Sequence, residues 1–444
     1  MKRSTLLVAA AAVLTASGAH AQERIKFDYW YGLTGQLGEV MQKHCDEFNA
    51  SQDKYEAVCS GQGGYDKAEQ NTIAAYRAKQ QPTIVQIYDA GTVNFMLSGA
   101  IYPANKFAED HGLDVNWDGY FPGISNYYAT STGDMWSFPY NSSTAVLYWN
   151  KDQWAKIGKD KAPATWAEFA ADLKALNEAG VECGFAFDFD TWMNLEQFSA
   201  INGLPIASMD NGYGGLGAEL VFNQTAFVDH MKNFKDWMDA GYAKIQTAQV
   251  GKNLVQAFSD GSCAATTTSI ANHGVVRSTA VEGLNWDVAM LPVLEEGNRT
   301  NSLVGGASLW IMDGKSEQEY EAAAAFLAYV TAPDTGEKFM VSNTGYIPVT
   351  TAGFELLTAE GFYEQPEYKG RELAIASLTA SDVTPVSRGI RLGNFTSIRA
   401  EIRSELEAAF TGQKTVEEAI NASVERGNQI LRRYEQTFKG AALP

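Results

Sequence analysis

The stretch IKFDYWYG, residues 25–32, begins the pattern that decides the fold of this chain. It reads as a strand, and two further strand-like runs follow it, KYEAVC (54–59) and TIVQIYD (83–89). Helical periodicity separates the runs, first over about 37–48 and then over about 66–79. This alternation predicts an α/β fold with a mostly parallel sheet, whose ligands bind beyond the carboxyl ends of its strands. Asp89 stands at such an end, and Tyr65 opens the helix before it.

A second α/β region follows Tyr140. The residue pattern predicts strands over 145–149, 185–187 and 220–222, helices over about 166–179 and 224–241, and two strands that return to the first region, over 263–267 and 286–291. From Ser316 onward the chain reads as largely helical, and Thr415 with Glu418 forms a capping box before the last helix. We therefore expect two lobes, one made of 22–140 plus 263–312 and the other of 141–262 plus 313–444.

The first 21 residues have the pattern of a signal peptide. Lys2 and Arg3 form a basic start, residues 6–14 are an apolar core, and Ala19-His20-Ala21 is a small-residue cleavage site. We expect export with cleavage after Ala21. The rest of the sequence has no apolar run near the ~20 residues that a membrane helix needs.

The composition limits the classes of partner. A formal net charge of −19 argues against nucleic acid and against an anionic membrane surface. An anionic ligand would need a local positive site. The negative net charge by itself needs no ligand to explain it, because charged surfaces keep proteins in solution.

Four cysteines allow three disulfide connectivities. Cys45 lies late in a predicted helix and Cys59 ends the strand after it, so a bridge between them is geometrically easy, and Cys183 then remains for Cys263. Export to an oxidising compartment makes both bridges a working hypothesis. The chain has no Cys-x-x-Cys or Cys/His spacing of a metal site.

Four scattered segments place small hydroxyl residues or glycines where a strand gives way to a turn or helix. They are NSSTAVLYWN (141–150), TTTSIANHG (266–274), GGASLW (305–310) and RGIRLGNFTSIR (388–399). Free backbone N–H groups and a guanidinium are the groups that bind a phosphate.

Arg399 is the most informative residue of these segments. It falls in the first turn of a helix predicted to begin near Thr396 or Ser397, where a positive charge opposes the helix dipole at a cost of roughly 0.3–1 kcal/mol. No carboxylate follows at the third or fourth position. Either a bound phosphate or a long-range salt bridge to the other lobe would explain it.

Together with TGYIPVT (344–350), these segments resemble those of the glycerol-3-phosphate-binding periplasmic proteins of bacterial ABC importers, from about Phe27 to the last helix. The resemblance implies the type II periplasmic-binding-protein fold, two lobes joined by several hinge crossings that close on glycerol 3-phosphate. It also implies an inner-membrane ABC permease as partner, a monomer, and neither an enzyme nor a cofactor. The phosphate ligands that it implies are Ser143, Ser269, Gly306, Tyr346 and Arg399.

At the glycerol end the match to the family is weaker. Tyr65 and Trp192 match a family tyrosine and tryptophan, whereas Asp89 replaces a glutamate and Phe189 stands where the family has another tryptophan. A shorter carboxylate and a smaller ring leave more room around the hydroxyls. We therefore also expect tolerance of a glycerophosphodiester such as glycerophosphocholine.

Two other functions remain open from the sequence. A sugar or oligosaccharide binder of the same fold would use stacking aromatics, which the 12% of Phe, Trp and Tyr allows. A periplasmic phosphodiesterase would need metal ligands or a nucleophile with a base.

Asp188 and Asp190 begin like a calcium loop, but Met193 and Ser199 replace its required glycine and glutamate.

Overall fold

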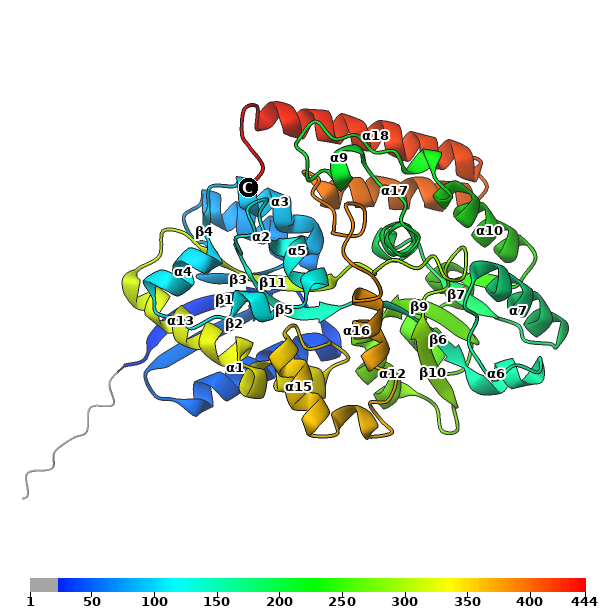
Figure 1. The fold of residues 1–444 in the computed structure, drawn as a ribbon, viewed down its shortest axis with the longest axis horizontal. Helices are drawn as coiled ribbons and strands as arrows, with labels where there is room; N and C mark the ends of the chain where they lie inside the picture. Colours follow the sequence, from blue (N-terminus) through cyan, green and yellow to red (C-terminus); the bar gives the residue numbers. More distant parts are fainter. Residues whose placement is uncertain (1–22) are drawn as a thin grey trace, which may run out of the picture.

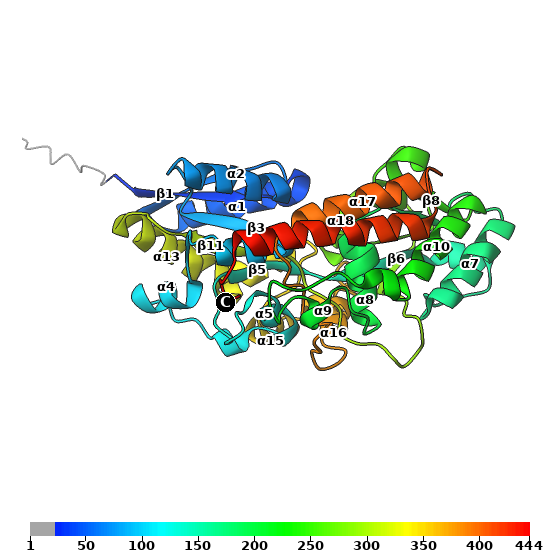
Figure 2. The same ribbon diagram turned by 90° about the horizontal axis from the view of Figure 1, so that it is seen from above.

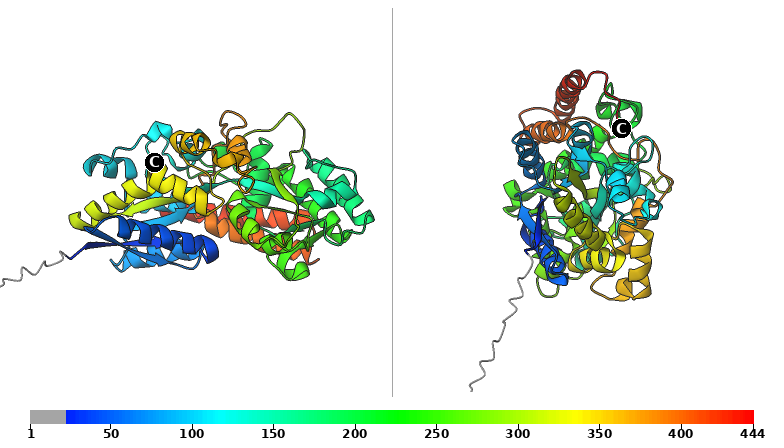
Figure 3. Two further views of the ribbon diagram at one scale, coloured as in Figure 1. Left: turned by 90° about the horizontal axis from the view of Figure 1, so that it is seen from below. Right: turned by 90° about the vertical axis from the view of Figure 1, so that its left-hand side faces the viewer.

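The computed structural model describes residues 23–444, so the predicted signal peptide lies outside the described residues. The chain forms two α/β lobes side by side, each built around one sheet (Figure 1, and from two further sides in Figure 3). In the first lobe the strand order is β2-β1-β3-β11-β4, and β5 also pairs with β11. The bounds of these strands are β1 (Ile25–Tyr31), β2 (Tyr55–Gly61), β3 (Ile84–Tyr88), β4 (Ile101–Tyr102), β5 (Phe138–Ser143) and β11 (Gly305–Met312).

The second lobe has a five-stranded sheet in the order β10-β6-β9-β7-β8. Its strands are β6 (Ala145–Asn150), β7 (Phe185–Phe187), β8 (Ala243–Ile245), β9 (Ala265–Ser269) and β10 (Trp286–Met290). Both sheets are mixed: β1 runs parallel to β2 and β3, and β7 runs parallel to β8 and β9, while β11, β6 and β10 pair antiparallel. The expectation of a mostly parallel sheet holds only for the first three strands.

Helices cover the faces of both sheets. In chain order the longer ones are α1 (Gly35–Ser51), α2 (Tyr65–Arg77), α3 (Thr92–Leu97), α4 (Ala104–Asp110), α5 (Pro122–Tyr128), α6 (Lys151–Lys156), α7 (Trp166–Glu178), α10 (Phe227–Asp239), α11 (Leu254–Ser259), α12 (His273–Thr279), α13 (Glu317–Thr331), α14 (Lys338–Asn343), α15 (Thr351–Ala359), α16 (Glu372–Leu378), α17 (Phe395–Phe410) and α18 (Val416–Thr437). Two short ones, α8 (Phe198–Ile201) and α9 (Ser208–Asn211), lie in the second lobe. The capping box predicted at Thr415 and Glu418 begins α18.

Each lobe has an aromatic core that follows from the sequence periodicity. In the first lobe, Phe48 of α1 and Phe27 of β1 meet Phe326 of α13, with ring centroids 5.2 and 5.5 Å apart. In the second, Phe169 of α7 packs edge-on against Phe185 of β7 at 5.1 Å. Burying several aromatic rings per lobe supplies a large part of the apolar area that stabilises each sheet.

The two lobes are connected by segments that are bonded to one another. The chain passes from β5 to β6 at Thr144 and from β10 back to β11 through 291–304. Thr144 Oγ1 donates to Leu303 O at 2.9 Å, and a third segment joins them, because Ser302 N donates to Ser377 O at 2.9 Å. We call Thr144, Leu303 and Ser377 with their neighbours the hinge segments. Helices α17 and α18 then run along both lobes (Figure 2).

The predicted lobe boundaries are wrong in several places. Strands β9 and β10 pair with β6 in the second sheet, so of the range 263–312 only β11 belongs to the first lobe. Helix α13 packs on β1, so it belongs to the first lobe and not to the second. Antiparallel pairing with β6 carries no sequence signal that distinguishes it from pairing in the other sheet.

One local prediction also changes. The strand expected over 220–222 is absent; Leu220 makes one isolated bridge with Ala207, and a 3-10 turn begins at Phe222. Within residues 23–444, no helix combines the length and the apolar character that crossing a membrane requires.

Two disulfides tie neighbouring elements together, and they are the two pairs hypothesised from the sequence. Cys45 of α1 is bonded to Cys59 of β2, and Cys183, just before β7, is bonded to Cys263, just before β9. The first closes a segment of 14 residues and the second one of 80 residues.

Candidate functional site

A cavity of about 590 Å³ lies between the lobes, at the ends of strands from both sheets. Eight of the nine residues predicted as ligands line it, although they come from segments spread over more than 330 positions. They are Tyr65, Asp89, Ser143, Trp192, Ser269, Gly306, Tyr346 and Arg399. We call this cavity the cleft.

The first lobe contributes an aromatic and an acidic residue at the carboxyl end of β3. Asp89 is the first residue after β3, and Tyr65 is the first residue of α2. The Tyr65 ring stacks on Tyr88 with centroids 5.3 Å apart, and its hydroxyl accepts a hydrogen bond from Asn141 Nδ2 at 2.9 Å. The Tyr65 side chain is therefore held in place by its neighbours.

The small residues Ser143 and Gly306 meet where β5 pairs with β11. Ser143 lies opposite Gly305, and Gly306 lies opposite Ser142. Gly306 has φ of +108°, and a Cβ there would stand 1.9 Å from the carbonyl oxygen of Asn141. Only glycine allows the two backbones to approach this closely at this conformation.

Trp192 begins a π-helical turn, η3 (Trp192–Gln197), in the second lobe. Its ring lies against Gly305, where a Cβ would stand 2.2 Å from Cζ2 of the indole. The glycine pair at the start of β11 therefore makes room for the tryptophan that lines the cleft.

Ser269 and Tyr346 complete the floor of the cleft. Ser269 is the last residue of β9, and its Oγ accepts a hydrogen bond from Ala271 N at 3.1 Å, so one lone pair of the hydroxyl is already used. Tyr346 is buried, and its carbonyl accepts a hydrogen bond from Nη2 of the buried Arg371 at 2.6 Å. Arg371 thus holds the loop that carries Tyr346.

The geometry corrects the expected distribution of these residues over the lobes. We expected Ser269 in the first lobe and Ser143 and Tyr346 in the second. Ser269 ends a strand of the second sheet, Ser143 ends a strand of the first, and Tyr346 packs in the core of the first lobe. Each of these three residues therefore lies in the lobe opposite to the predicted one.

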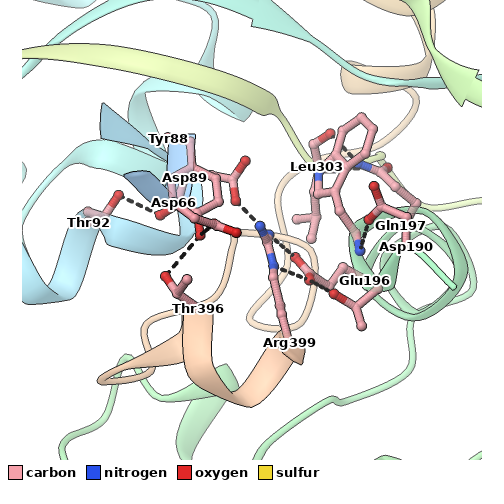
Figure 4. A network of polar contacts seen from close by, with 12 residues as sticks. Asp66, Tyr88, Asp89, Thr92, Asp190, Glu196, Gln197, Leu303, Thr396 and Arg399 are labelled. Carbon is pink, nitrogen blue, oxygen red and sulfur yellow. Dashed lines mark hydrogen bonds and ion pairs between the residues drawn. The ribbon is translucent and has the colours of Figure 1, made fainter. Parts of the chain in front are cut away.

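Arg399 lies at the centre of an ion cluster that spans the cleft (Figure 4). Helix α17 begins at Phe395, earlier than predicted, so Arg399 is its fifth residue and lies just beyond the first turn. Its Nε and Nη2 donate to Glu196 at 2.7 Å each, and Nη2 also donates to Asp89 at 2.5 Å. Of the two explanations that the sequence left open, the long-range salt bridge is the one present here.

The ion cluster is buried, and this shifts its titration. The side chains of Arg399, Asp89 and Glu196 are 10%, 6% and 1% exposed. Burial raises the pKa of Glu196 to about 7 and also raises the pKa of Asp89, in both cases against the lowering effect of Arg399. Burial opposes the charge of Arg399, but the two carboxylates outweigh it and raise its pKa.

Several charged residues of the cleft were not predicted as site residues. Besides Glu196 in the cluster, the lining includes Asp66, Lys67, Asp188, Asp190 and Arg403. Burial, followed by the neighbouring Asp190, raises the pKa of Asp188 to about 6. Arg403, one turn after Arg399 on α17, could have been found from the i+4 spacing, whereas nothing near Glu196 in the sequence marks it.

Phe189 is the one predicted ligand that does not line the cleft. Its ring packs against Phe187 and Phe410, with centroids 6.1 and 5.0 Å apart, and it faces a separate surface hollow. Asp188 and Asp190 line both the cleft and this hollow, whereas Phe189 lines the hollow alone. The described residues hold no group of three or more His, Cys, Asp or Glu side chains arranged to bind a metal ion.

Comparisons with known proteins agree with this architecture. The family model of bacterial extracellular solute-binding proteins matches residues 43–365. The sn-glycerol-3-phosphate-binding periplasmic protein UgpB of Yersinia pseudotuberculosis is 37% identical over 429 residues, covering 95% of both chains. The protein of the same name from Escherichia coli O1:K1 is 36% identical over 449 residues, covering 99% of this chain and 100% of the relative.

Solved structures with a similar fold include proteins with different ligands. UgpB of Mycobacterium tuberculosis in complex with glycerophosphocholine has a TM-score of 0.74 at 20% identity, covering 92% of this chain and 98% of that one. The substrate-binding protein Lmo0181 of Listeria monocytogenes in complex with cycloalternan has a TM-score of 0.76 at 16% identity, covering 92% and 100%. At these identities the likeness concerns the fold.

Proposed function

This chain belongs to the bacterial extracellular solute-binding proteins, and from this membership we propose that it binds glycerol 3-phosphate or a glycerophosphodiester in its cleft and delivers the ligand to an ABC permease. The observation that carries the proposal is the convergence of eight predicted ligand residues on one cavity. Relatives at 36–37% identity over nearly the whole chain carry the glycerol-3-phosphate-binding name, which supports the same ligand class here.

In this proposal the phosphate contacts a cradle of hydroxyl and backbone groups. Ser143, Ser269 and Tyr346 offer hydroxyls, the backbone at Gly306 offers an N–H, and Arg399 offers its free nitrogen Nη1. Tyr65, Asp89 and Trp192 face the glycerol part. Phe189 is no longer part of the proposed site, because its ring packs against Phe187 and Phe410 outside the cleft.

The proposed mechanism is closure of the two lobes around the ligand. Residues from both sheets line the cleft, so a ligand that contacts both of them favours the closed form over the open one. The permease would recognise the closed form. The protein acts as a monomeric carrier in the periplasm after cleavage behind Ala21, and it catalyses no reaction and needs no cofactor.

A thermal-unfolding series tests this function. Purified protein is heated with glycerol 3-phosphate, glycerophosphocholine, inorganic phosphate or maltose at matched ionic strength. A ligand at 100 times its dissociation constant adds about 2.7 kcal/mol of stability, a shift of a few degrees. We expect the shift with one or both glycerol phosphates and none with maltose; a shift with maltose alone refutes the proposal.

A specific observation supports a sugar as the second candidate ligand. Four aspartates, Asp66, Asp89, Asp188 and Asp190, line the cleft together with aromatic rings, and carboxylates with rings are the groups that bind sugar hydroxyls and sugar faces. The maltose arm of the same series distinguishes this candidate from the first.

A further inference from the structure

The carboxylates that pair with Arg399 outnumber its single positive charge. Arg399 lies between two buried carboxylates, Asp89 from the first lobe and Glu196 from the second (Figure 4). Glu196 binds it through both oxygens, with Nε and Nη2 donating at 2.7 Å each. One positive charge therefore faces two carboxylates, and the cluster is net negative when both are ionised.

The remaining donors of Arg399 can be counted. A guanidinium has five N–H groups. Nε uses one and Nη2 uses both of its own, so Nη1 with two N–H groups is left, and no hydrogen bond from it is found within residues 23–444. Arg399 thus presents two hydrogen-bond donors to the cleft without an uncompensated positive charge.

Within residues 23–444, the groups that face Glu196 offer no second cation. They are Arg399 from α17, Asp89 after β3, Asp190 before η3, and Tyr127 from α5. The Thr191 hydroxyl lies 3.4 Å from Glu196 Oε1. Lys67 and Arg403 also line the cleft, but both are exposed at its rim, where solvent and salt screen them. The field at the buried phosphate position is set by the cluster.

We propose that Glu196 is a specificity-determining residue that, together with Asp89, compensates Arg399 in advance, so that the cleft selects monoanionic glycerophosphodiesters over dianionic glycerol 3-phosphate. This inference rests on the proposed function and narrows its ligand class. A monoester near pH 8 brings two negative charges and a diester brings one, and Coulomb repulsion from a net negative cluster doubles with the ligand charge. The two N–H groups of Nη1 suffice for one or two diester oxygens.

The titration of Glu196 agrees with this selection. Burial raises its pKa to about 7, so the cluster loses its net charge when Glu196 takes up a proton. A second negative charge in the cleft favours that protonation. Selection against the dianion is therefore strongest at alkaline pH, where both carboxyls and the monoester are fully ionised.

The test compares ligands that differ by one capped oxygen. Calorimetry at about pH 8 measures the dissociation constants of glycerol 3-phosphate and its monomethyl ester for the wild type, Glu196→Gln and Glu405→Gln. We expect the wild type to bind the methyl ester about tenfold more tightly, and Glu196→Gln to reduce this ratio about fivefold or more. Glu405, a buried carboxylate paired with Arg426 on the far side of α17, gives the same change of net charge, and its variant should keep the wild-type ratio.

A second comparison needs no variant. Glycerol 3-sulfate has the shape of glycerol 3-phosphate but only one negative charge, so the wild type should bind the sulfate ester at least as tightly at about pH 8. The inference is overturned if the phosphate monoester binds more tightly than both monoanions, or if Glu196→Gln leaves the ratio unchanged. In either case phosphate esters still bind and the proposed function stands, whereas binding of none of the three esters refutes both.

Discussion

The indole of Trp192 lies directly on the backbone of Gly305, in the space that a Cβ at Gly305 would occupy. The contact joins the π-helical turn of the second lobe to β11 of the first. It therefore fixes the position of one aromatic wall of the cleft relative to the opposite sheet.

Replacing Gly305 by alanine should move this wall. The new Cβ would stand 2.2 Å from the ring, so Trp192 must rotate or the backbone must shift, at a cost of about 1–3 kcal/mol. We expect weaker ligand binding by calorimetry and a changed tryptophan fluorescence. Gly217→Ala is the control, because its Cβ would meet only side-chain atoms at 3.7 Å or more. An unchanged affinity in Gly305→Ala would show that Trp192 does not contact the ligand.

Removing Arg399 should affect both binding and stability. Arg399→Ala leaves Asp89 and Glu196 buried without their cation, which destabilises a protein by about 3–5 kcal/mol. Ligand binding should weaken by about 1.5–3 kcal/mol for the lost charged hydrogen bond. Urea unfolding should show a smaller stability loss at about pH 5.5 than at pH 8, because protonation of the carboxyls relieves their repulsion.

The control for this change is Arg403→Ala, which removes an exposed positive charge from the same helix. Its stability should stay within about 0.5 kcal/mol of the wild type. If Arg399→Ala binds as tightly as the wild type, Arg399 does not contact the ligand.

His230 should make the protein less stable in acid. It is buried against Phe198, with ring centroids 3.9 Å apart, and burial lowers its pKa to about 3. A lowered histidine pKa contributes stability that is present above the unfolded pKa of 6.5 and is lost as pH falls toward the folded value. Between about pH 7.5 and 5.5 this loss amounts to about 1.4 kcal/mol.

Urea unfolding of the wild type and His230→Phe at both pH values isolates this contribution, because the other titrating groups cancel in the difference. The variant should lose less stability on acidification. Equal slopes in the two proteins would mean that His230 is charged in the folded state.

The two disulfides should stabilise unequally. In the chain-entropy model, the segment of 80 residues closed by Cys183–Cys263 corresponds to about 4.5 kcal/mol and the segment of 14 closed by Cys45–Cys59 to about 3 kcal/mol. Cys183→Ala/Cys263→Ala should therefore lower the urea midpoint more than Cys45→Ala/Cys59→Ala. The reverse order would contradict the entropic account.

The parts of the fold that local patterns determine could be predicted from the sequence. The β1-α1-β2-α2-β3 unit follows from hydrophobic periodicity, and the start of α18 follows from its capping box. The sheet to which β9 and β10 belong could not be predicted, because the two partners of each pairing lie far apart in the chain and either strand fits either sheet.

The candidate site, like the fold, could be predicted from the sequence only in part. Residues at or just after strand ends, such as Asp89 and Ser269, could be placed from the rule that ligands bind at strand ends. Glu196 could not, because its role depends on an arginine 203 positions away. Phe189 was misplaced because a resemblance transfers an aligned position but not the direction in which its side chain points.

The bonded hinge segments limit how the two lobes can move relative to each other. A single connecting segment between two lobes allows many relative motions, whereas three segments bonded side by side through Thr144, Ser302 and Ser377 act as one hinge. Such a hinge favours rotation about one axis, so ligands of different size and charge would rotate the lobes about the same axis. Ligands would then differ in the degree of lobe closure that they favour. A docking partner can recognise this degree of closure without contacting the ligand.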